Sequence, residues 1–210
     1  MAQNDDLYSA ILNGDAPKAF TATEVALAAG TTPMELIADS MVPAMNEVGR
    51  LFEAEEYFVP ELLLAGRAMK KAMELLRPLM VAAGQKLSTR VVVGTVKGDL
   101  HDIGKNIVAS MLEGSGFEVI DLGADVSAEH FVTAVKEHTP QVVCMSALLT
   151  VTMPAMKTTI DALRAAGLRT RVKVLIGGAP VTSQYAKEIG ADGYSENASG
   201  AVGLVKNLLA

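Results

Sequence analysis

The pattern of the sequence changes at residues 91–106, which read VVVGTVKGDLHDIGKN. Val91–Thr95 is an unbroken apolar run of strand length, and a polar turn follows it before a helical pattern begins at Ile103. A strand that is apolar on both faces is typical of a parallel sheet that helices cover on both sides. This stretch therefore predicts the first strand–helix unit of an α/β domain.

The same alternation repeats along the rest of the chain. The further predicted strands are Glu118–Leu122, Val142–Met145, Val172–Ile176 and Gly193–Tyr194, and the predicted helices are Ile103–Gly114, Ala128–Glu137, Pro154–Gly167, Val181–Ile189 and Ser199–Leu209. Five such units predict a doubly wound, flavodoxin-like (Rossmann-type) domain with a five-stranded parallel sheet over residues 90–210. The ligand site of such a sheet lies at the carboxyl ends of its strands.

Upstream of Gly84 the sequence predicts helices only. Apolar residues recur at helical spacing in four segments, which are Asp5–Asn13, Pro17–Ala29, Pro33–Val48 and the residues that follow Pro60 as far as Met80. Pro43 predicts a kink in the third helix. Four helices with short loops predict a small bundle over residues 1–86, and the polar segment 84–89 is the predicted linker and hinge.

The composition limits the classes of function. The 210 residues are 50% hydrophobic and carry a net charge of −6, so the chain can bury a core but offers no basic surface for nucleic acid. No apolar run is long enough to cross a bilayer, and the acidic N-terminus does not resemble a signal peptide. The single cysteine, Cys144, predicts a buried thiol. We therefore expect a cytoplasmic protein that binds neither nucleic acid nor a membrane.

The loop after the first strand carries the most informative residues. Asp99 precedes His101 by two residues, a spacing at which its carboxylate can accept the proton of one ring nitrogen and leave the other as a lone pair. Asp102 is the predicted cap of the helix at Ile103, and Gly104 removes a side chain where a bulky group must approach. The loop lacks the glycine pattern of a dinucleotide site and the Gly-Lys-Ser/Thr of a phosphate loop.

One histidine cannot hold zinc, which requires three or four ligands. His101 is therefore predicted to give one axial bond to a metal that a corrin or haem macrocycle already holds. Ordinary roles stay open at this point, because a lone histidine in a loop is usually polar surface and a helix N-terminus also attracts anions.

Three separated segments together resemble the signatures of cobalamin-binding domains. Asp99-x-His101-x-x-Gly104 resembles the Asp-x-His-x-x-Gly motif, Ser146-Ala147-Leu148-Leu149-Thr150 resembles the Ser-x-Leu segment, and Gly177-Gly178-Ala179 resembles the Gly-Gly pair. The resemblance covers essentially the whole chain. It points to corrinoid proteins of the methyltransferase type, which include the cobalamin module of methionine synthase and the stand-alone proteins of methanol, methylamine and methoxy-aromatic methyl transfer. Taken singly, a Gly-Gly pair is an ordinary turn and a serine at a strand end is an ordinary cap.

The resemblance implies a site at the strand ends for cobalamin or a related corrinoid, methylcobalamin included. The nucleotide tail would leave the cobalt and enter a slot lined by small residues, and His101 would bind the cobalt from below. Catalytic roles would fall to His101, Asp99 and Ser146, whose hydroxyl would join the Asp99–His101 hydrogen-bond chain. The implied cofactor contacts are Gly94, Gly98, Asp99, Leu100, His101, Asp102, Ile103, Gly104, Ser146, Leu148, Thr150, Gly177, Gly178, Ala179 and Tyr194.

The resemblance also gives the helical half a role as a cap. In the family, the segment that matches Leu51–Leu62 covers the upper face of the corrinoid, and the residues that match the methyl-shielding positions are Phe52, Val59 and Leu62. The same three residues fit the core of the bundle equally well.

The implied function is that of a methyl carrier. The chain would accept a methyl group on cobalt from a substrate-specific methyltransferase and donate it through a second methyltransferase, with a reductive activase as a further partner. Lys97 stands where methanol and methylamine relatives often have Glu, which favours a methoxy-aromatic donor.

Three alternatives remain. A cobalamin-dependent regulator would need an additional DNA-binding domain, and the small subunit of an adenosylcobalamin mutase would generally lack the helical cap. A flavodoxin-like binding module without metal would leave the Asp99–His101 pair without a purpose.

Overall fold

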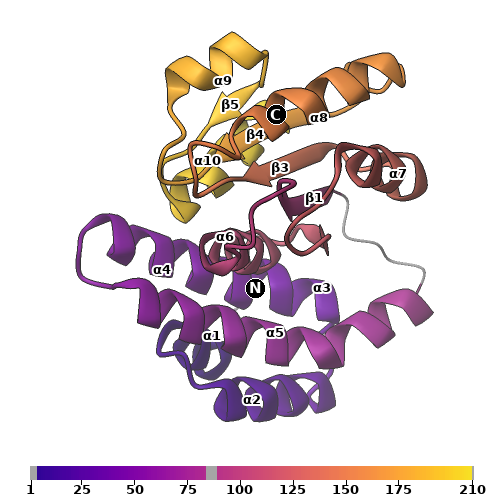
Figure 1. Cartoon of the computed structure of the whole chain (residues 1–210). Coiled ribbons are helices and arrows are strands. Elements are labelled where there is room, and N and C mark those ends of the chain that lie inside the picture. Colours follow the sequence, from indigo (N-terminus) through magenta and orange to yellow (C-terminus); the bar gives the residue numbers. More distant parts are fainter. Residues whose placement is uncertain (1–3, 84–88, 210) are drawn as a thin grey trace. The chain divides into compact units, whose positions relative to one another are not determined.

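The computed structural model describes residues 4–83 and 89–209 (Figure 1). The chain divides into two compact units, which we call the helical unit and the sheet unit. The helical unit comprises Met1–Ser88 with Ser110–Phe117, and the sheet unit comprises Thr89–Ala109 with Glu118–Ala210. The predicted domains were residues 1–86 and 90–210. The structure instead groups residues 110–117 with the helical unit. The predicted linker lies outside the described residues except for Thr89.

The helical unit contains the four predicted helices. Its elements are α1 (Asp5–Leu12), α2 (Ala16–Ala28), α3 (Pro33–Leu36), the π-helical turn η1 (Ile37–Met41), α4 (Val42–Glu53) and α5 (Val59–Ala82). The side chains of Asn4, Asp15 and Thr32 accept backbone N–H groups at the starts of α1, α2 and α3. These short polar side chains satisfy donors that have no partner within the first helical turn.

The predicted third helix appears as an unbroken succession of α3, η1 and α4. Pro43 lies in the first turn of α4, directly after η1. Proline has no N–H, and its ring crowds the carbonyl four residues earlier, so regular α-helical bonding is interrupted and a wider π-helical turn takes its place.

The core of the helical unit is rich in leucine and methionine. Its largest fully buried side chains are Leu7, Ile11, Leu36, Met41, Met45, Leu62, Met69 and Leu76. Leu62, Met69 and Leu76 recur every seven residues, so they lie on one face of α5. Helix α5 contacts α1, α2, α3 and α4, and this shared apolar face explains how one long helix organises the bundle.

The sheet unit has the predicted doubly wound fold. Its strands are β1 (Arg90–Thr95), β2 (Glu118–Asp121), β3 (Val142–Ser146), β4 (Lys173–Gly177) and β5 (Gly193–Tyr194), all parallel in the order β2-β1-β3-β4-β5. Its helices are α6 (Ile103–Gly114, within the sheet unit as far as Ala109), α7 (Ala128–His138), α8 (Pro154–Ala165), α9 (Ser183–Ile189) and α10 (Ala198–Leu209). This order is that of flavodoxin-like folds, as expected.

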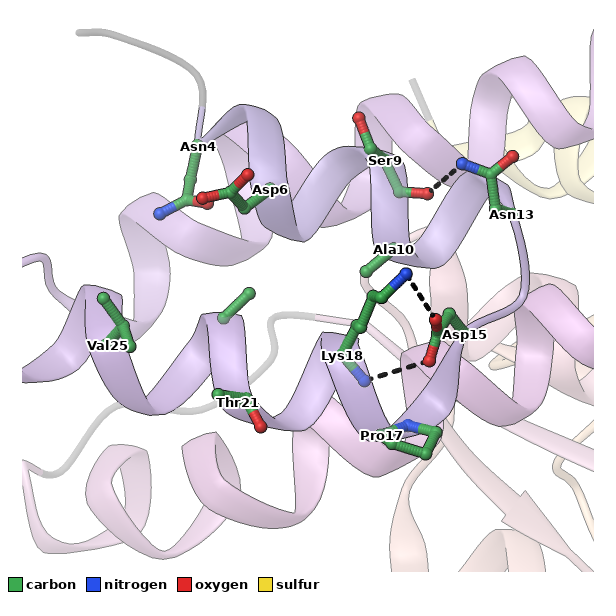
Figure 2. Close-up of a pocket in the computed structure, with 11 residues that line it drawn as sticks. Asn4, Asp6, Ser9, Ala10, Asn13, Asp15, Pro17, Lys18, Thr21 and Val25 are labelled. Carbon is green, nitrogen blue, oxygen red and sulfur yellow. Dashed lines mark hydrogen bonds and ion pairs between the residues drawn. The ribbon is translucent and has the colours of Figure 1, made fainter.

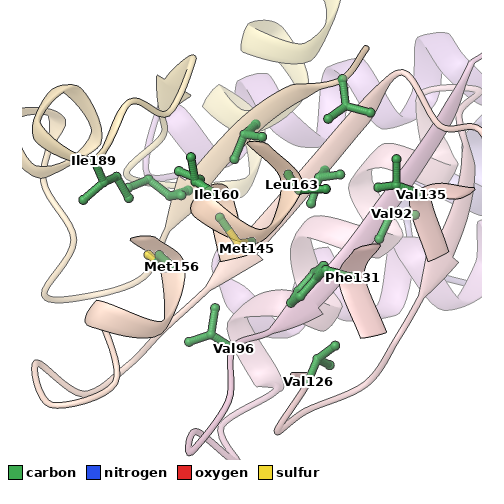
Figure 3. Packing of buried hydrophobic residues seen from close by; sticks show 14 of the residues in the cluster. Val92, Val96, Val126, Phe131, Val135, Met145, Met156, Ile160, Leu163 and Ile189 are labelled. Carbon is green, nitrogen blue, oxygen red and sulfur yellow. The ribbon is translucent and has the colours of Figure 1, made fainter. Parts of the chain in front are cut away.

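Alternate strand residues build the core on the face that α7, α8 and α9 cover (Figure 3). Val92, Val143, Met145, Val174 and Ile176 point to this face because side chains alternate along a strand. They pack there with Phe131 of α7 and with Met156, Ile160 and Leu163 of α8. Val91, Val93, Val142 and Leu175, which alternate with them along the strands, are buried as well, and this explains the continuous apolar runs in the sequence.

Strand register aligns the carboxyl ends of three strands. Thr95 of β1 pairs with Ser146 of β3, and Ser146 pairs with Gly177 of β4. The strand order reverses direction between β1 and β3, and ligands of open α/β sheets bind at such a switch point. The loops after β1 and β3 therefore flank the expected site. None of the described helices has the length and apolar character required to cross a membrane.

Candidate functional site

A buried carboxylate, Asp99, lies at the centre of the strand-end loops. Its side chain is fully buried, and one carboxylate oxygen, Oδ2, accepts hydrogen bonds from the loop after β3. The donors are the Thr152 hydroxyl at 2.7 Å, the Leu148 N–H at 2.8 Å and the Leu149 N–H at 3.3 Å. The other oxygen, Oδ1, accepts the backbone N–H of His101 at 3.1 Å. Asp99 thus joins the loops after β1 and β3.

Hydrogen bonding keeps Asp99 ionised. Burial raises the pKa of its carboxyl group, but the hydrogen bonds, that from Thr152 foremost, outweigh burial and hold the pKa well below its ordinary value. An ionised carboxylate only accepts hydrogen bonds, so any group that contacts it closely must donate a proton.

His101 is oriented by this carboxylate as the sequence predicted. Its Nδ1 lies 2.8 Å from Asp99 Oδ1, and its side chain is 51% exposed. Because Asp99 is an acceptor, Nδ1 carries the proton, and in the neutral ring this places the lone pair on Nε2. Within residues 4–83 and 89–209 no protein group bonds Nε2. The Thr95 hydroxyl donates to the His101 carbonyl at 3.0 Å and holds the backbone of the loop.

The hydroxyl in this network comes from Thr152. Ser146 was expected to supply it, but the bond that Asp99 receives from a side-chain hydroxyl is that of Thr152, six residues further along. Sequence reasoning missed Thr152, since a hydroxyl two residues before Pro154 is normally assigned to the start of a helix. The predicted cofactor contact at Ser146 stays a prediction. Thr95, also fully buried, was missed for a similar reason, because it reads as an ordinary strand residue.

The glycines expected to line a slot have different environments. A Cβ at Gly94 would lie 2.8 Å from the Phe131 ring, so core packing fills that space and Gly94 opens no slot there. Gly178 has a φ of +125°, and a Cβ would lie 1.9 Å from the Ala147 carbonyl oxygen. Only glycine allows this close approach of the loops after β3 and β4. A Cβ at Gly104, in contrast, would meet no atom within 4 Å.

The other predicted contacts of the sheet unit are dispersed around this centre. Asp102 precedes α6, where its carbonyl accepts the Asn106 N–H and its carboxylate accepts the Asn106 side chain at 3.1 Å in place of a backbone cap. Gly98 forms the turn before Asp99 with a φ of +85°. Thr150 and Ala179 are exposed. Tyr194 lies on β5 and packs against the core.

The three residues predicted for the cap differ in burial. Leu62 is a core residue of the helical unit. Phe52 lies near the end of α4 and is half-buried, and Val59 begins α5 and is exposed. Phe58 beside it is also exposed. Of the predicted three, only Phe52 and Val59 retain surface that a ligand could contact.

The strand-end loops suit a metal that brings its own ligands. No group of three or more His, Cys, Asp or Glu in the described parts of the chain could hold a metal ion alone. The loops after β1 and β3 and the start of α6 also expose large apolar side chains to water, namely Leu100, Ile103, Leu148, Leu149 and Val151. One nitrogen ligand with an apolar rim and the open space at Gly104 fit the face of a macrocycle such as a corrin.

A groove elsewhere in the helical unit does not share these features. It has a volume of about 730 Å³ and lies along α1 and α2 (Figure 2). Its charged residues include Asp6, Asp15 and Lys18, and Lys18 pairs with Asp15 at 3.1 Å. None of the predicted site residues lines this groove.

Comparisons with known protein families identify B12 binding domains in this chain. Two family models, each described as a B12 binding domain, match residues 89–203 and 3–77. Dimethylamine corrinoid protein 1 of Methanosarcina acetivorans is 47% identical over 85% of this chain and 84% of its own. Trimethylamine corrinoid protein 1 of the same organism is 44% identical over 100% of both chains.

Two solved structures are similar to this chain along nearly its whole length. A cobalamin-binding protein from Desulfitobacterium hafniense DCB-2 is 37% identical with a TM-score of 0.80 and covers 99% of this chain and 98% of its own. The methanol:cobalamin methyltransferase complex of Methanosarcina barkeri matches with 31% identity and a TM-score of 0.88 over 98% of this chain and 79% of that chain.

Proposed function

The chain belongs to the family of corrinoid proteins with a B12 binding domain, and on this premise we propose that it carries methyl groups between two methyltransferases. A bound corrinoid supplies the cobalt to which a methyl group is attached and from which it is released. The observation that carries the proposal is the buried Asp99 carboxylate, which fixes the proton of His101 on Nδ1 and leaves Nε2 as a ligand.

The residues of the loops have separate tasks in this proposal. His101 would hold the metal through the lone pair of Nε2, on a side chain that is half-exposed. Asp99 would orient the ring, because its carboxylate accepts the Nδ1 proton. Thr152 and the backbone N–H of Leu148 hold Asp99 in place.

The apolar rim provides the binding surface. Leu100, Ile103 and Val151 are each more than two thirds exposed. Covering apolar side chains of this size is favourable by about 25 cal/mol for each Å² removed from water. We assign to them the contact with the corrin ring, and the same cover keeps water away from the bond between His101 and the metal.

A methylated amine is the proposed donor. The curated relatives described above are named as dimethylamine and trimethylamine corrinoid proteins, and they match most or all of this chain. Lys97 pointed to a methoxy-aromatic donor, but its ammonium group pairs with Asp125 at 2.9 Å. This pairing gives Lys97 a role in the loop itself and removes the reason to connect it with the donor.

The partners follow from the same proposal. One methyltransferase would act on the amine, a second would serve the methyl acceptor, and a reductive activase would be needed to reactivate the protein when its cofactor is oxidised. A protein of this kind exchanges methyl groups only inside such a system, so its activity is measured with a partner enzyme present.

The test uses the full chain reconstituted with hydroxocobalamin. After reduction to the cob(I) form, the protein is mixed with an amine-specific methyltransferase and trimethylamine or dimethylamine, or with a methoxy-aromatic methyltransferase and its substrate. We expect the cob(I) absorbance to decay into that of methylcobalamin with an amine. Methylation from the methoxy-aromatic compound alone would overturn the proposed donor, and failure to retain any corrinoid would overturn the proposed function.

A further inference from the structure

Asp125 lies in the loop between β2 and α7 and has an unusual backbone conformation. Its φ is +56°, in the left-handed region that few residues other than glycine adopt without strain. Asp and Asn tolerate this region better than other side chains do, yet it still costs free energy. A non-glycine residue in this conformation therefore calls for a reason.

Asp125 takes part in three hydrogen bonds that provide this reason. Its Oδ1 accepts the Gly98 N–H at 2.8 Å, and its Oδ2 accepts the Lys97 ammonium at 2.9 Å. Its own backbone N–H donates to the Asp99 carbonyl at 2.9 Å. The left-handed conformation thus lets one residue hold the backbone of both Gly98 and Asp99.

The next residue, Val126, also bonds to the chain at the end of β1. Val126 pairs with Val96 as an isolated parallel bridge, and the Val126 N–H donates to the Thr95 carbonyl at 2.9 Å. The loop after β1, which carries His101 and which we call the histidine loop, is therefore held on two sides. The loop after β2 holds its backbone, and the loop after β3 holds the Asp99 carboxylate.

The three bonds of Asp125 differ in weight. The side chains of Lys97 and Asp125 are 62% and 40% exposed, so their ion pair contributes little in water. The bonds to Gly98 and Asp99 hold the backbone at the buried Asp99 carboxylate, so they restrict the direction in which that side chain points. A glycine at position 125 would relieve the strained φ but lose the acceptor, so both demands are met only by Asp or Asn.

We propose that Asp125 is a positioning residue that sets the orientation of His101 toward the metal by holding the backbone on both sides of the turn into Asp99. The proposal rests on the proposed function, because it assigns His101 the role of metal ligand. Asp125 itself touches neither His101 nor the cofactor in this assignment, and it acts through Gly98 and Asp99.

The experiment compares Asp125→Gly, Asp125→Asn and Lys97→Ala with wild type. Asp125→Gly adopts the positive φ without strain but lacks the carboxylate that accepts the Gly98 N–H. In Asp125→Asn an acceptor oxygen remains for Gly98, and in Lys97→Ala only the exposed ion pair is removed. Melting temperatures of all four proteins are recorded as a reference for folding.

The first readout needs no cofactor. The apoprotein is labelled with ¹⁵N-histidine, and the His101 signals are identified by their absence in His101→Ala, since the chain has 3 histidines. Wild type should show the tautomer with the proton on Nδ1 and slow exchange of that proton. Asp125→Gly should show a mixture of tautomers and an exchange rate about tenfold faster, whereas Asp125→Asn and Lys97→Ala should resemble wild type.

The second readout uses the protein loaded with cob(II)alamin. Loss of a residue that orients a metal ligand typically lowers affinity about 10- to 100-fold. We expect Asp125→Gly to weaken corrinoid binding at least tenfold and to reduce the nitrogen splitting of the paramagnetic resonance spectrum, with recovery in Asp125→Asn. Unchanged His101 signals in Asp125→Gly, or equal losses in Asp125→Asn and Asp125→Gly, would overturn the proposal. If wild type binds no corrinoid, the proposed function fails, while the histidine signals still decide whether Asp125 orients the ring.

Discussion

The ionisation of Asp99 follows from a competition between burial and hydrogen bonding at one residue. Burial favours the neutral acid, but the bonds from Thr152, His101 and Leu148 favour the carboxylate and prevail. The lowered pKa then determines which nitrogen of His101 carries the proton, and so which nitrogen can bind a metal. A two-residue motif acts here through partners elsewhere in the chain.

Replacing Asp99 by Asn should weaken corrinoid binding about 10- to 100-fold, because an amide no longer provides the negative charge that stabilises the Nδ1 proton. The dissociation constant is measured by titrating the apoprotein with hydroxocobalamin. Asp6→Asn removes the same charge from an exposed residue of α1 that is not among the predicted contacts, and it should bind as wild type does. Equal affinity of both variants would contradict the role of Asp99.

Thr152→Val keeps the shape of the side chain and removes the hydroxyl that bonds Asp99. We expect a loss of about 1–3 kcal/mol in the free energy of unfolding, since a buried carboxylate loses a donor. Thr152→Ser retains the hydroxyl and should lose less. Urea unfolding at neutral pH measures both variants, and equal loss would show that the methyl group of Thr152 matters more than its bond.

The same variant predicts a change with pH. The pKa of Asp99 is lower in the folded than in the unfolded protein, so its stabilising contribution is complete above the ordinary value of 3.8 and is lost as pH falls through the lowered value. Thr152→Val raises the folded pKa toward 3.8, so the loss should begin at the same pH as in wild type but should be smaller and end at a higher pH. Unfolding free energies measured as a function of acidic pH test the direction of this shift.

At the scale of elements, two glycines have different surroundings, and we expect one to matter for stability and the other for corrinoid binding. Gly178 follows β4 at a position where the neighbouring loop leaves no room for a Cβ, whereas Gly104 lies in the first turn of α6 with open space beside it. Glycine thus serves the fold at the first position. At the second position it has no packing role, and its role in leaving access for a ligand stays a prediction.

Gly178→Ala should lower the free energy of unfolding by about 2 kcal/mol or more, because of its positive φ and the contact with the Ala147 carbonyl. Gly104→Ala should leave the stability of the apoprotein unchanged or slightly higher, yet weaken corrinoid binding. Thermal unfolding and hydroxocobalamin titration of both variants distinguish the two roles. Normal binding by Gly104→Ala would remove Gly104 from the site.

At the scale of the whole molecule, the helical unit raises the question of the cap. Leu62 is buried within its own unit, so its substitution reports on folding. Phe52 and Val59 retain surface, and their proposed role as a shield for the methyl group stays a prediction.

Phe52→Ala should leave corrinoid bound while photolysis or oxidation of the methylcobalamin form becomes faster, because an apolar shield excludes water and oxygen. Leu62→Ala should instead lower the free energy of unfolding by about 2–5 kcal/mol. Absorbance decay under light and urea unfolding are measured for both. A Phe52→Ala protein that is unstable and keeps wild-type decay would place Phe52 in the core.

Local pattern alone determined most of the fold. The five strand–helix units, the helical first half and the Asp99–His101 pair depend on residue periodicity and on a spacing of two, which are properties of adjacent residues. The sequence also predicted that Pro43 would disturb its helix. A kink was expected there, and the structure has a π-helical turn directly before this residue.

Only the tertiary structure decided how the histidine loop is held. Thr152 reaches Asp99 across 53 residues, and Asp125 reaches Gly98 across 27. Gly94 faces the Phe131 ring, so it opens no slot, and Leu62 belongs to a helical core. Such contacts depend on strand order and register, which bring distant loops together at one edge of the sheet. No local pattern encodes which hydroxyl or carboxylate meets the loop there, because the choice depends on distances that exist only after folding.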